Sequence, residues 1–310
     1  MKIGMLTDSL PDLAFEAMLE QAATLGIECL EFACGNWSTA PHIRLDRMLE
    51  SDEARREFLA KVRGHGLSIS ALNCSGNPLF PGTEGARQND ITLKTFRLAR
   101  LLGIDRIVMM SGLPGGPGDA NPNWITTEWP PECRSILQYQ WDERIIPYWR
   151  DLVGVARDNG IRQICLELHG HQAVYNPRTL LRLRDAVGET VGANYDPSHL
   201  LGMGADPLAA IRALGGAIYY VHAKDTRIEP IPAAIDGILE TRPASDVASR
   251  SWNYVTLGFG HGEAWWRQFC AALRMAGYDD VLSIEHEDSL IDPVEGVRKS
   301  VELLRNVAYR

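Results

Sequence analysis

The amino-acid sequence predicts an α/β protein with a (β/α)8 TIM barrel fold and long loops after strands 4 and 7. A short apolar segment followed by an amphipathic helix pattern occurs eight times along the chain, which is the number of units in a closed barrel. The apolar segments are also continuous, as in RIVMM and IYYV, and such strands are typical of a parallel sheet covered by helices.

The eight predicted strands are short, apolar and evenly spaced. They are residues 3–7, 27–33, 67–73, 105–111, 162–168, 191–196, 217–223 and 281–286. The helix patterns that follow them span about 12–25, 51–65, 85–102, 142–159, 177–186, 206–214, 263–276 and 293–307. Gly26 is placed as a helix C-cap, Ser51 as an N-cap and Pro293 as a first-turn residue.

The alternative architecture is an open, doubly wound sheet. A dinucleotide-binding sheet of that kind has a glycine-rich fingerprint after its first strand, and this sequence has none there. Eight regular units without a linker between them favour closure of the sheet into a barrel. We therefore expect a single barrel domain over residues 1–310.

Composition narrows the class of protein. The chain has 310 residues, 45% of them hydrophobic and 23% charged, as expected for a globular protein. A net charge of −9 disfavours nucleic acid and anionic membranes as partners. The six cysteines form no CxxC pair, which argues against a disulfide scaffold or a zinc ribbon. Without a long apolar run or a signal-peptide pattern, we expect a cytoplasmic protein.

Two predicted loops, 112–141 and 224–262, are too long for a minimal barrel. Both follow strands and so belong to the C-terminal face, where barrel enzymes carry their active sites. The first contains GLPGGPG and three tryptophans, but it lacks the Lys-Ser/Thr of a phosphate-binding loop. The second contains Trp252 and the GFGHG stretch. Their aromatic content opposes disorder and is compatible with a homo-oligomer or a small partner subunit.

Four consecutive predicted strands each end in a possible metal ligand. These ligands are Glu167 in LELHG, Asp196 in NYDPSH, His222 in VHAKD and Glu285 in SIEHED. Three carboxylates close together are costly without a cation. Three oxygen ligands and one imidazole suit Mn²⁺, our first expectation, or Mg²⁺, Co²⁺ or Zn²⁺. Each residue alone could be a helix cap, an ion pair or a structural histidine, but four equivalent positions together favour one metal ion.

Other polar and aromatic side chains near the strand ends suit substrate contacts. His169 is in phase with Glu167, and Lys224 is in phase with His222, although an ion pair with Asp225 is the alternative for Lys224. Further candidates are His199 for proton transfer, Glu31 and Asn73 for hydroxyl groups, His261 in the long loop, and Trp124 for stacking. For Trp124 the alternative is packing within its own loop.

With these motifs in order, the sequence resembles the xylose isomerase-like barrel superfamily, often called sugar phosphate isomerases/epimerases, over essentially the whole chain. The resemblance rests on LELHG, NYDPSHL, VHAKD, GFGHGEAWW and LSIEHED. It implies metal ligation by Glu167, Asp196, His222 and Glu285. It also implies that the two glutamates exchange protons with the substrate and that His199 and Lys224 approach it.

The sequence departs from the common pattern of this superfamily in its two long loops. Gly260-His261-Gly262 stands where a glycine-acid-glycine turn is usual, after an insertion of roughly 30 residues. These features resemble a subgroup that includes lyases acting on 3-keto-glycosides, such as large subunits of C-glycoside deglycosidases. The DNA-repair branch, endonuclease IV, has metal-binding histidines on its middle strands, where this chain has Asn73 and Ser111.

Two reactions follow from this set of residues. The first is a metal-dependent sugar isomerase or epimerase that abstracts a proton next to a sugar carbonyl through a metal-stabilised enediolate, with Glu167 and Glu285 as proton carriers. The second is a metal-dependent lyase or dehydratase, similar to a C-glycoside deglycosidase or an inosose dehydratase, with His169 or His199 as the general acid. A sugar-binding subunit without activity is the third, non-enzymatic interpretation.

Overall fold

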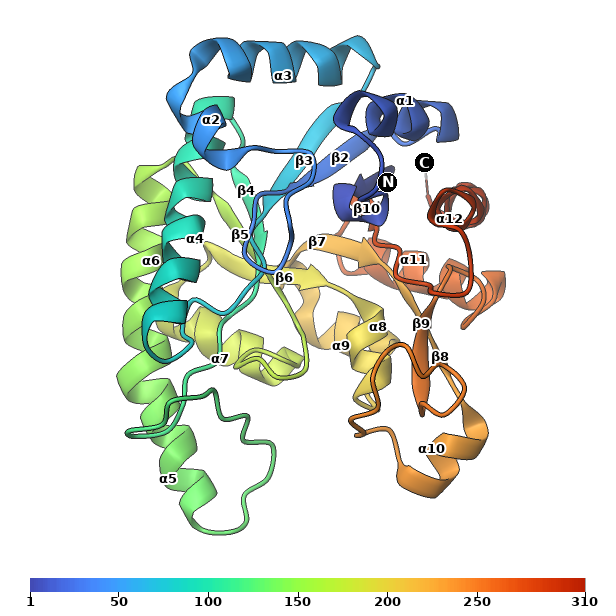
Figure 1. The fold of residues 1–310 in the computed structure, drawn as a ribbon. Coiled ribbons are helices and arrows are strands. Elements are labelled where there is room, and N and C mark those ends of the chain that lie inside the picture. The colour runs from blue at the N-terminus through green and yellow to red at the C-terminus, as the bar shows by residue number, and fades with distance from the viewer. Residues whose placement is uncertain (310) are drawn as a thin grey trace. The chain divides into compact units, whose positions relative to one another are not determined.

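Eight parallel strands close into a barrel in the computed structural model, which describes residues 1–309 (Figure 1). The hydrogen-bonded order is β1-β10-β7-β6-β5-β4-β3-β2. The strands are β1 Lys2–Leu6, β2 Cys29–Ala33, β3 Ser68–Asn73, β4 Arg106–Met109, β5 Gln163–Glu167, β6 Val191–Tyr195, β7 Ile218–Ala223 and β10 Val281–Ile284. The predicted fold class is therefore confirmed, and every predicted strand contains an observed one or overlaps it.

The helices follow the strands as the sequence predicts. They are α1 Phe15–Leu25, α2 Leu45–Glu50, α3 Asp52–Gly64, α4 Thr83–Leu102, α5 Glu132–Tyr139, α6 Ile146–Asp158, α7 Pro177–Val187, α8 Pro197–Gly202, α9 Pro207–Leu214, α10 Pro230–Asp236, α11 Glu263–Met275 and α12 Pro293–Val307. Short 3₁₀ turns lie at Thr7–Ser9 and Gly215–Ala217. Gly26 ends α1 with a φ of +83°, in the left-handed region that glycine tolerates best.

The first long loop contains a helix, α5, that the sequence pattern did not predict. A π-helical segment, Gln140–Ile145, joins α5 to α6, so the helix predicted over 142–159 begins ten residues earlier, at Glu132. Trp141 and Trp149 are buried here, and Trp149 Nε1 donates a hydrogen bond to the carbonyl of Ser111, 2.9 Å away. These two tryptophans therefore pack the core.

The second long loop folds into a small antiparallel sheet that the sequence did not predict. Its strands are β8 Asp225–Ile228 and β9 Trp252–Val255, and α10 lies between them in the chain (Figure 1). In their register, Asp225 pairs with Val255 and Thr226 with Tyr254. The insertion is thus an ordered hairpin that begins directly after β7.

The chain divides into two compact units. The first comprises residues 1–32, 58–70 and 194–310, and the second comprises 33–57 and 71–193. Within the first unit, β10 pairs with both β1 and β7, and Ser283 lies opposite Gly4 and His222. Among residues 1–309, no helix has the length and apolarity of a membrane span.

Candidate metal centre

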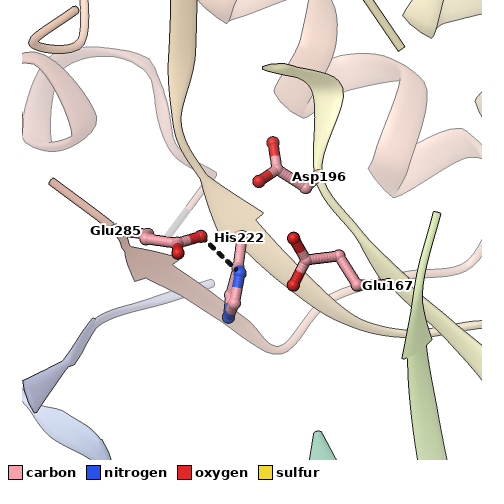
Figure 2. Close-up of side chains that lie close together, drawn as sticks. All are labelled: Glu167, Asp196, His222 and Glu285. Atoms are coloured by element: carbon pink, nitrogen blue, oxygen red, sulfur yellow. Dashed lines mark ion pairs between the residues drawn. The ribbon is translucent and has the colours of Figure 1, made fainter. Parts of the chain in front are cut away.

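Three of the expected ligands gather within the first unit. Asp196 directly follows β6 and caps α8, because one of its carboxylate oxygens accepts a hydrogen bond from the Ser198 N–H at 2.7 Å. His222 lies near the end of β7, and Glu285 directly follows β10. The His222 Nδ1 atom lies 2.9 Å from Glu285 Oε2, as the dashed line in Figure 2 shows.

The fourth expected ligand, Glu167, ends β5 in the second unit. Each of the four residues offers one ligand atom, and these atoms all lie within 4.8 Å of one another (Figure 2). Glu167, Asp196 and His222 are buried, and Glu285 is partly buried. Three carboxylates and an imidazole form a donor set that divalent metal ions accept.

Glu31 fixes the orientation of the histidine. Its carboxylate oxygens lie 2.9 and 3.1 Å from His222 Nε2, and Ser283 Oγ donates a hydrogen bond to the same group. Because an ionised carboxylate only accepts, Nε2 carries a proton and Nδ1 turns its ring edge to Glu285. Glu31 is predicted from the sequence to contact substrate hydroxyls, but its carboxylate is buried and bonded to His222 and Ser283.

The positions of His222 Nδ1 and Glu285 Oε2 are suited to binding a cation between them. Glu285 Oε2 is buried, and His222 Nδ1 lies 2.9 Å from it. Two basic atoms that face each other at this distance require either a shared proton or a shared cation. A neighbouring carboxylate on the other ring nitrogen is the usual support for a metal-ligating histidine.

The charges at this cluster shift the pKa values of His222 and Glu285 so that the ionised form of each side chain is favoured. Burial by itself lowers the pKa of His222, but the carboxylates of Glu31 and Glu285 outweigh it and raise that pKa well above 6.5. Burial likewise raises the pKa of Glu285, but Lys224 and His222 outweigh it, and the pKa falls below its usual value of 4.5. Opposite charges therefore stabilise one another in the absence of a bound ion.

Lys224 is buried beside the cluster. Its Nζ atom lies 3.4 Å from Glu285 Oε1 and 2.9 Å from Glu287 Oε2. It also lies over the ring of Tyr254, 4.2 Å from the ring centre, in a cation–π arrangement. The ion pair with Asp225 that the sequence left open is replaced by these carboxylate partners.

His199 connects the cluster of candidate ligands to the β8–β9 hairpin. Its Nε2 atom lies 3.3 Å from Asp196 Oδ2, and its Nδ1 atom lies 2.9 Å from the hydroxyl of Tyr254 on β9. Burial lowers the pKa of His199 to about 4, so the imidazole is neutral at pH 7. Sequence reasoning missed Tyr254, because nothing in the WNYV segment indicates that it folds back onto α8.

His261 is held by Asp225. The His261 Nδ1 atom lies 2.8 Å from Asp225 Oδ1, and the other carboxylate oxygen accepts backbone N–H groups from Gly258, Gly260 and His261. Asp225 is fully buried. This one carboxylate therefore organises the GFGHG turn and orients the imidazole that the sequence singled out.

The remaining predicted side chains lie in the second unit. His169 follows Glu167 by two residues, and its ring centre is 6.2 Å from that of Trp37. The Asn73 Oδ1 atom accepts a hydrogen bond from the Ser75 N–H at 2.8 Å, so part of this side chain shapes the turn after β3. Trp124 packs edge-to-face against Tyr175 and borders a separate cavity.

Comparison with known proteins places the chain in a family. A model of the xylose isomerase-like TIM barrel matches residues 19–307, and the chain therefore belongs to that family. It is 52% identical over 308 residues to the uncharacterized protein YfiH of Bacillus subtilis (strain 168), with 98% of each chain covered.

Two solved structures show the same fold at low sequence identity. One is a D-psicose 3-epimerase with D-tagatose from Clostridium cellulolyticum H10, 16% identical, with a TM-score of 0.66 and complete coverage of both chains. The other is the IolI protein with a zinc atom, 18% identical, with a TM-score of 0.67 and coverage of 99% of this chain and 98% of that one.

Proposed function

We propose that this chain is a divalent-metal-dependent sugar isomerase or epimerase that removes a proton from the carbon next to a sugar carbonyl. The observation that carries the proposal is the grouping of four ligand atoms from Glu167, Asp196, His222 and Glu285 within 4.8 Å. Membership of the xylose isomerase-like family supports a sugar-modifying enzyme. The structural likeness to a sugar epimerase and to a zinc-binding protein agrees with it.

The donor set is suited to Mn²⁺, Mg²⁺, Co²⁺ or Zn²⁺, and we choose Mn²⁺ for the first tests. A divalent cation bound there supplies the positive charge that stabilises negative charge on the oxygens of the substrate as the proton leaves. Glu31 keeps the Nδ1 edge of His222 turned to the cluster, and Asp196 is held by its cap on α8.

The two glutamates carry the proton. One of Glu167 and Glu285 takes it as general base; return by the other to the opposite face gives an epimer, and return to the adjacent carbon gives an isomer. Lys224, 3.4 Å from Glu285, keeps that carboxylate ionised and ready to accept. His199, neutral and bonded to Tyr254, is placed to hydrogen-bond a substrate oxygen.

Elimination shares the first half of this reaction. If a substituent next to the abstracted proton leaves, with His169 or His199 as the acid, the same residues act as a lyase or dehydratase. Asn73, Lys224, Trp124 and His261 remain our candidates for substrate contacts in either reaction.

The test is proton exchange in D₂O. Keto sugars and 3-keto-glycosides are incubated with protein and Mn²⁺ and followed by NMR. We expect deuterium at the carbon next to the carbonyl, with loss of exchange on chelation and recovery when Mn²⁺ is restored. Release of water or of an aglycone would identify elimination instead.

A matched pair of variants controls the exchange experiment. Glu285→Gln removes a carboxylate from the cluster, whereas Glu287→Gln changes only a partner of Lys224 that is not one of the four ligands. We expect exchange to stop in the first and to persist in the second. Absence of exchange with every sugar, in protein shown to hold one metal ion per chain, contradicts the proposal.

A further inference from the structure

Trp37 follows β2 in the second unit, and its side chain reaches the loop after β5. The ring centres of Trp37 and His169 are 6.2 Å apart. In the barrel, β3 and β4 lie between β2 and β5. At the usual strand spacing, the ends of β2 and β5 are therefore about 14 Å apart along the sheet. The indole thus extends past the ends of the two intervening strands, on the face that carries Glu167 at the end of β5.

The backbone that carries Trp37 is held in an unusual conformation. Gly35 has a φ of +138° and Asn36 a φ of +65°, values that glycine adopts freely and asparagine more readily than most residues. Asn36 Nδ2 donates a hydrogen bond to the carbonyl of Cys74 at 2.9 Å. The Trp37 N–H donates to the carbonyl of Ser75 at 3.1 Å. Two hydrogen bonds to the loop after β3 therefore fix the position of this turn.

The loop after β3 is shaped to receive the turn. Gly76 has no side chain, and a Cβ there would lie 2.7 Å from the Cβ of Asn36 and 2.5 Å from Gln88 Oε1. Strained turns persist where their surroundings determine them, and they cluster at ligand-binding and active sites. This turn does not bury the side chain that it carries, because Trp37 remains 51% exposed. What it provides is a fixed position for an exposed indole.

His169 borders the indole without covering it. The two rings are inclined at 56°, so the imidazole does not lie flat on the indole as a stacked ring would. The His169 Nδ1 atom lies 2.5 Å from the carbonyl oxygen of Gly170, which orients the imidazole, and His169 follows Glu167 by two residues. A flat apolar surface beside a polar ring suits a ligand that is apolar on one face and polar at its edge.

A sugar ring has this chemistry. A pyranose with equatorial hydroxyl groups presents only C–H bonds on its two faces and carries its hydroxyl groups around the rim. One face can therefore pack on an indole while the rim keeps its hydrogen bonds. An open-chain polyol has no preformed apolar face, because it must order several rotatable bonds to present one. A rigidly held indole therefore favours the ring.

We propose that Trp37 is a substrate-binding residue that stacks on the C–H face of a sugar ring and favours cyclic over open-chain substrates. The inference rests on the proposed function, because that function places a sugar beside Glu167. The four candidate ligands can bind the oxygens of a cyclic or an open-chain sugar alike. Trp37 adds the contact that distinguishes the two.

The experiment measures the binding of two unreactive probes, methyl β-D-glucopyranoside and D-glucitol, to the full-length protein supplied with Mn²⁺. The first is a ring and the second is the open chain of the same configuration. Ligand-observed NMR follows both titrations. We expect the glucoside to bind about threefold to tenfold more tightly than glucitol. Trp37→Ala should remove that difference by weakening the glucoside alone, and Trp37→Phe should retain most of it.

Trp129→Ala is the matched control, because Trp129 is also an exposed loop tryptophan of the second unit, with 72% of the residue exposed. It should leave both affinities unchanged. Equal binding of the two probes by the wild type overturns the proposal, as does the absence of glucoside binding. An equal loss of both probes in Trp37→Ala also overturns it, since that result indicates a structural role.

The outcome is distinguishable from that of the proposed function. Neither probe has a carbonyl group, so their binding requires no proton abstraction. Ring-selective binding that depends on Trp37, without proton exchange on any keto sugar, supports the role of Trp37 and contradicts the isomerase. Proton exchange on a keto sugar, with no change in ring preference in Trp37→Ala, supports the isomerase and overturns the role of Trp37.

Discussion

The Nε2 atom of His222 lies 2.9 Å from Oε2 of Glu31, a residue 191 positions earlier in the chain. Both side chains are fully buried, and Ser283 donates a second hydrogen bond to the same carboxylate. This pairing decides which nitrogen of the imidazole carries the proton and therefore which edge is available to a cation. The carboxylate of Glu31 acts on the proposed metal site through the histidine.

Glu31→Gln should weaken Mn²⁺ binding about tenfold to 100-fold, the usual cost of losing the partner of a metal-ligating histidine. A carboxamide of the same shape preserves packing but no longer fixes the protonated nitrogen. Competition with a fluorescent chelator measures the affinity. Glu28→Gln is the control, because Glu28 accepts a backbone hydrogen bond from Ile3 at 2.8 Å and its amide counterpart can do the same. Equal affinities for wild type and Glu31→Gln would remove Glu31 from the metal site.

Metal binding should release a proton near neutral pH. Against burial, Glu31 and Glu285 raise the pKa of His222 well above 6.5, so the metal-free protein holds the imidazolium at pH 7. Only the neutral ring binds a cation, so one proton leaves and the apparent affinity rises about tenfold per pH unit below that pKa. Calorimetry in buffers with different ionisation enthalpies measures the released proton. A heat of binding that does not depend on the buffer contradicts this prediction.

The fold could be predicted from the sequence because each barrel unit has a local signature. An apolar segment such as RIVMM and a capped amphipathic helix are visible within 30 residues, and all eight strands were found this way. The β8–β9 hairpin was missed because DTRI and WNYV are short, polar in part and separated by 23 residues. Their pairing depends on tertiary contacts rather than on local pattern.

The grouping of Glu167, Asp196, His222 and Glu285 could be predicted because strand ends in a parallel barrel meet at one face, whatever the details of packing. The residues that support these four side chains could not be predicted from the sequence. Glu31 pairs with His222 across the barrel interior, and Tyr254 reaches His199 from an insertion. Such partners depend on side-chain direction across non-adjacent elements, which alternation along one strand does not specify. A glutamate within the otherwise apolar CLEFA segment was the one sequence signal that could have suggested a role beneath the site.

Glu167→Gln and Glu285→Gln should each abolish proton exchange with the substrate, because a carboxamide cannot take up the proton. Metal content is measured beside the rate, since both residues belong to the candidate ligand set. Wild-type exchange in either variant with metal bound would show that the two carboxylates do not carry the proton.

Tyr254→Phe should lower kcat by up to about tenfold while leaving Mn²⁺ affinity nearly unchanged. The change removes the hydroxyl bonded to His199 Nδ1 at 2.9 Å but keeps the ring that lies under Lys224. His199 then loses the contact that orients it, whereas the four candidate ligands keep theirs. Tyr148→Phe is the matched control, since it removes a half-buried hydroxyl bonded to Asn89 on α4. Equal effects of both substitutions on kcat would show that the hydrogen bond to His199 has no particular role.

The GFGHG turn offers a matched pair of serine substitutions. At Gly260 an added Cβ would press against the Thr226 carbonyl and lie 2.7 Å from Asp225 Oδ1, whereas at Gly262 it would meet nothing within 4 Å. Gly262 also occupies the N-cap of α11, a position that favours serine. Gly260→Ser should therefore lower the free energy of unfolding by about 1–3 kcal/mol, and Gly262→Ser should change it by less than about 0.5 kcal/mol. Denaturant unfolding measures both. Because Asp225 orients His261, Gly260→Ser should also lower kcat/KM; a stability loss without any change in rate would place His261 outside the substrate site.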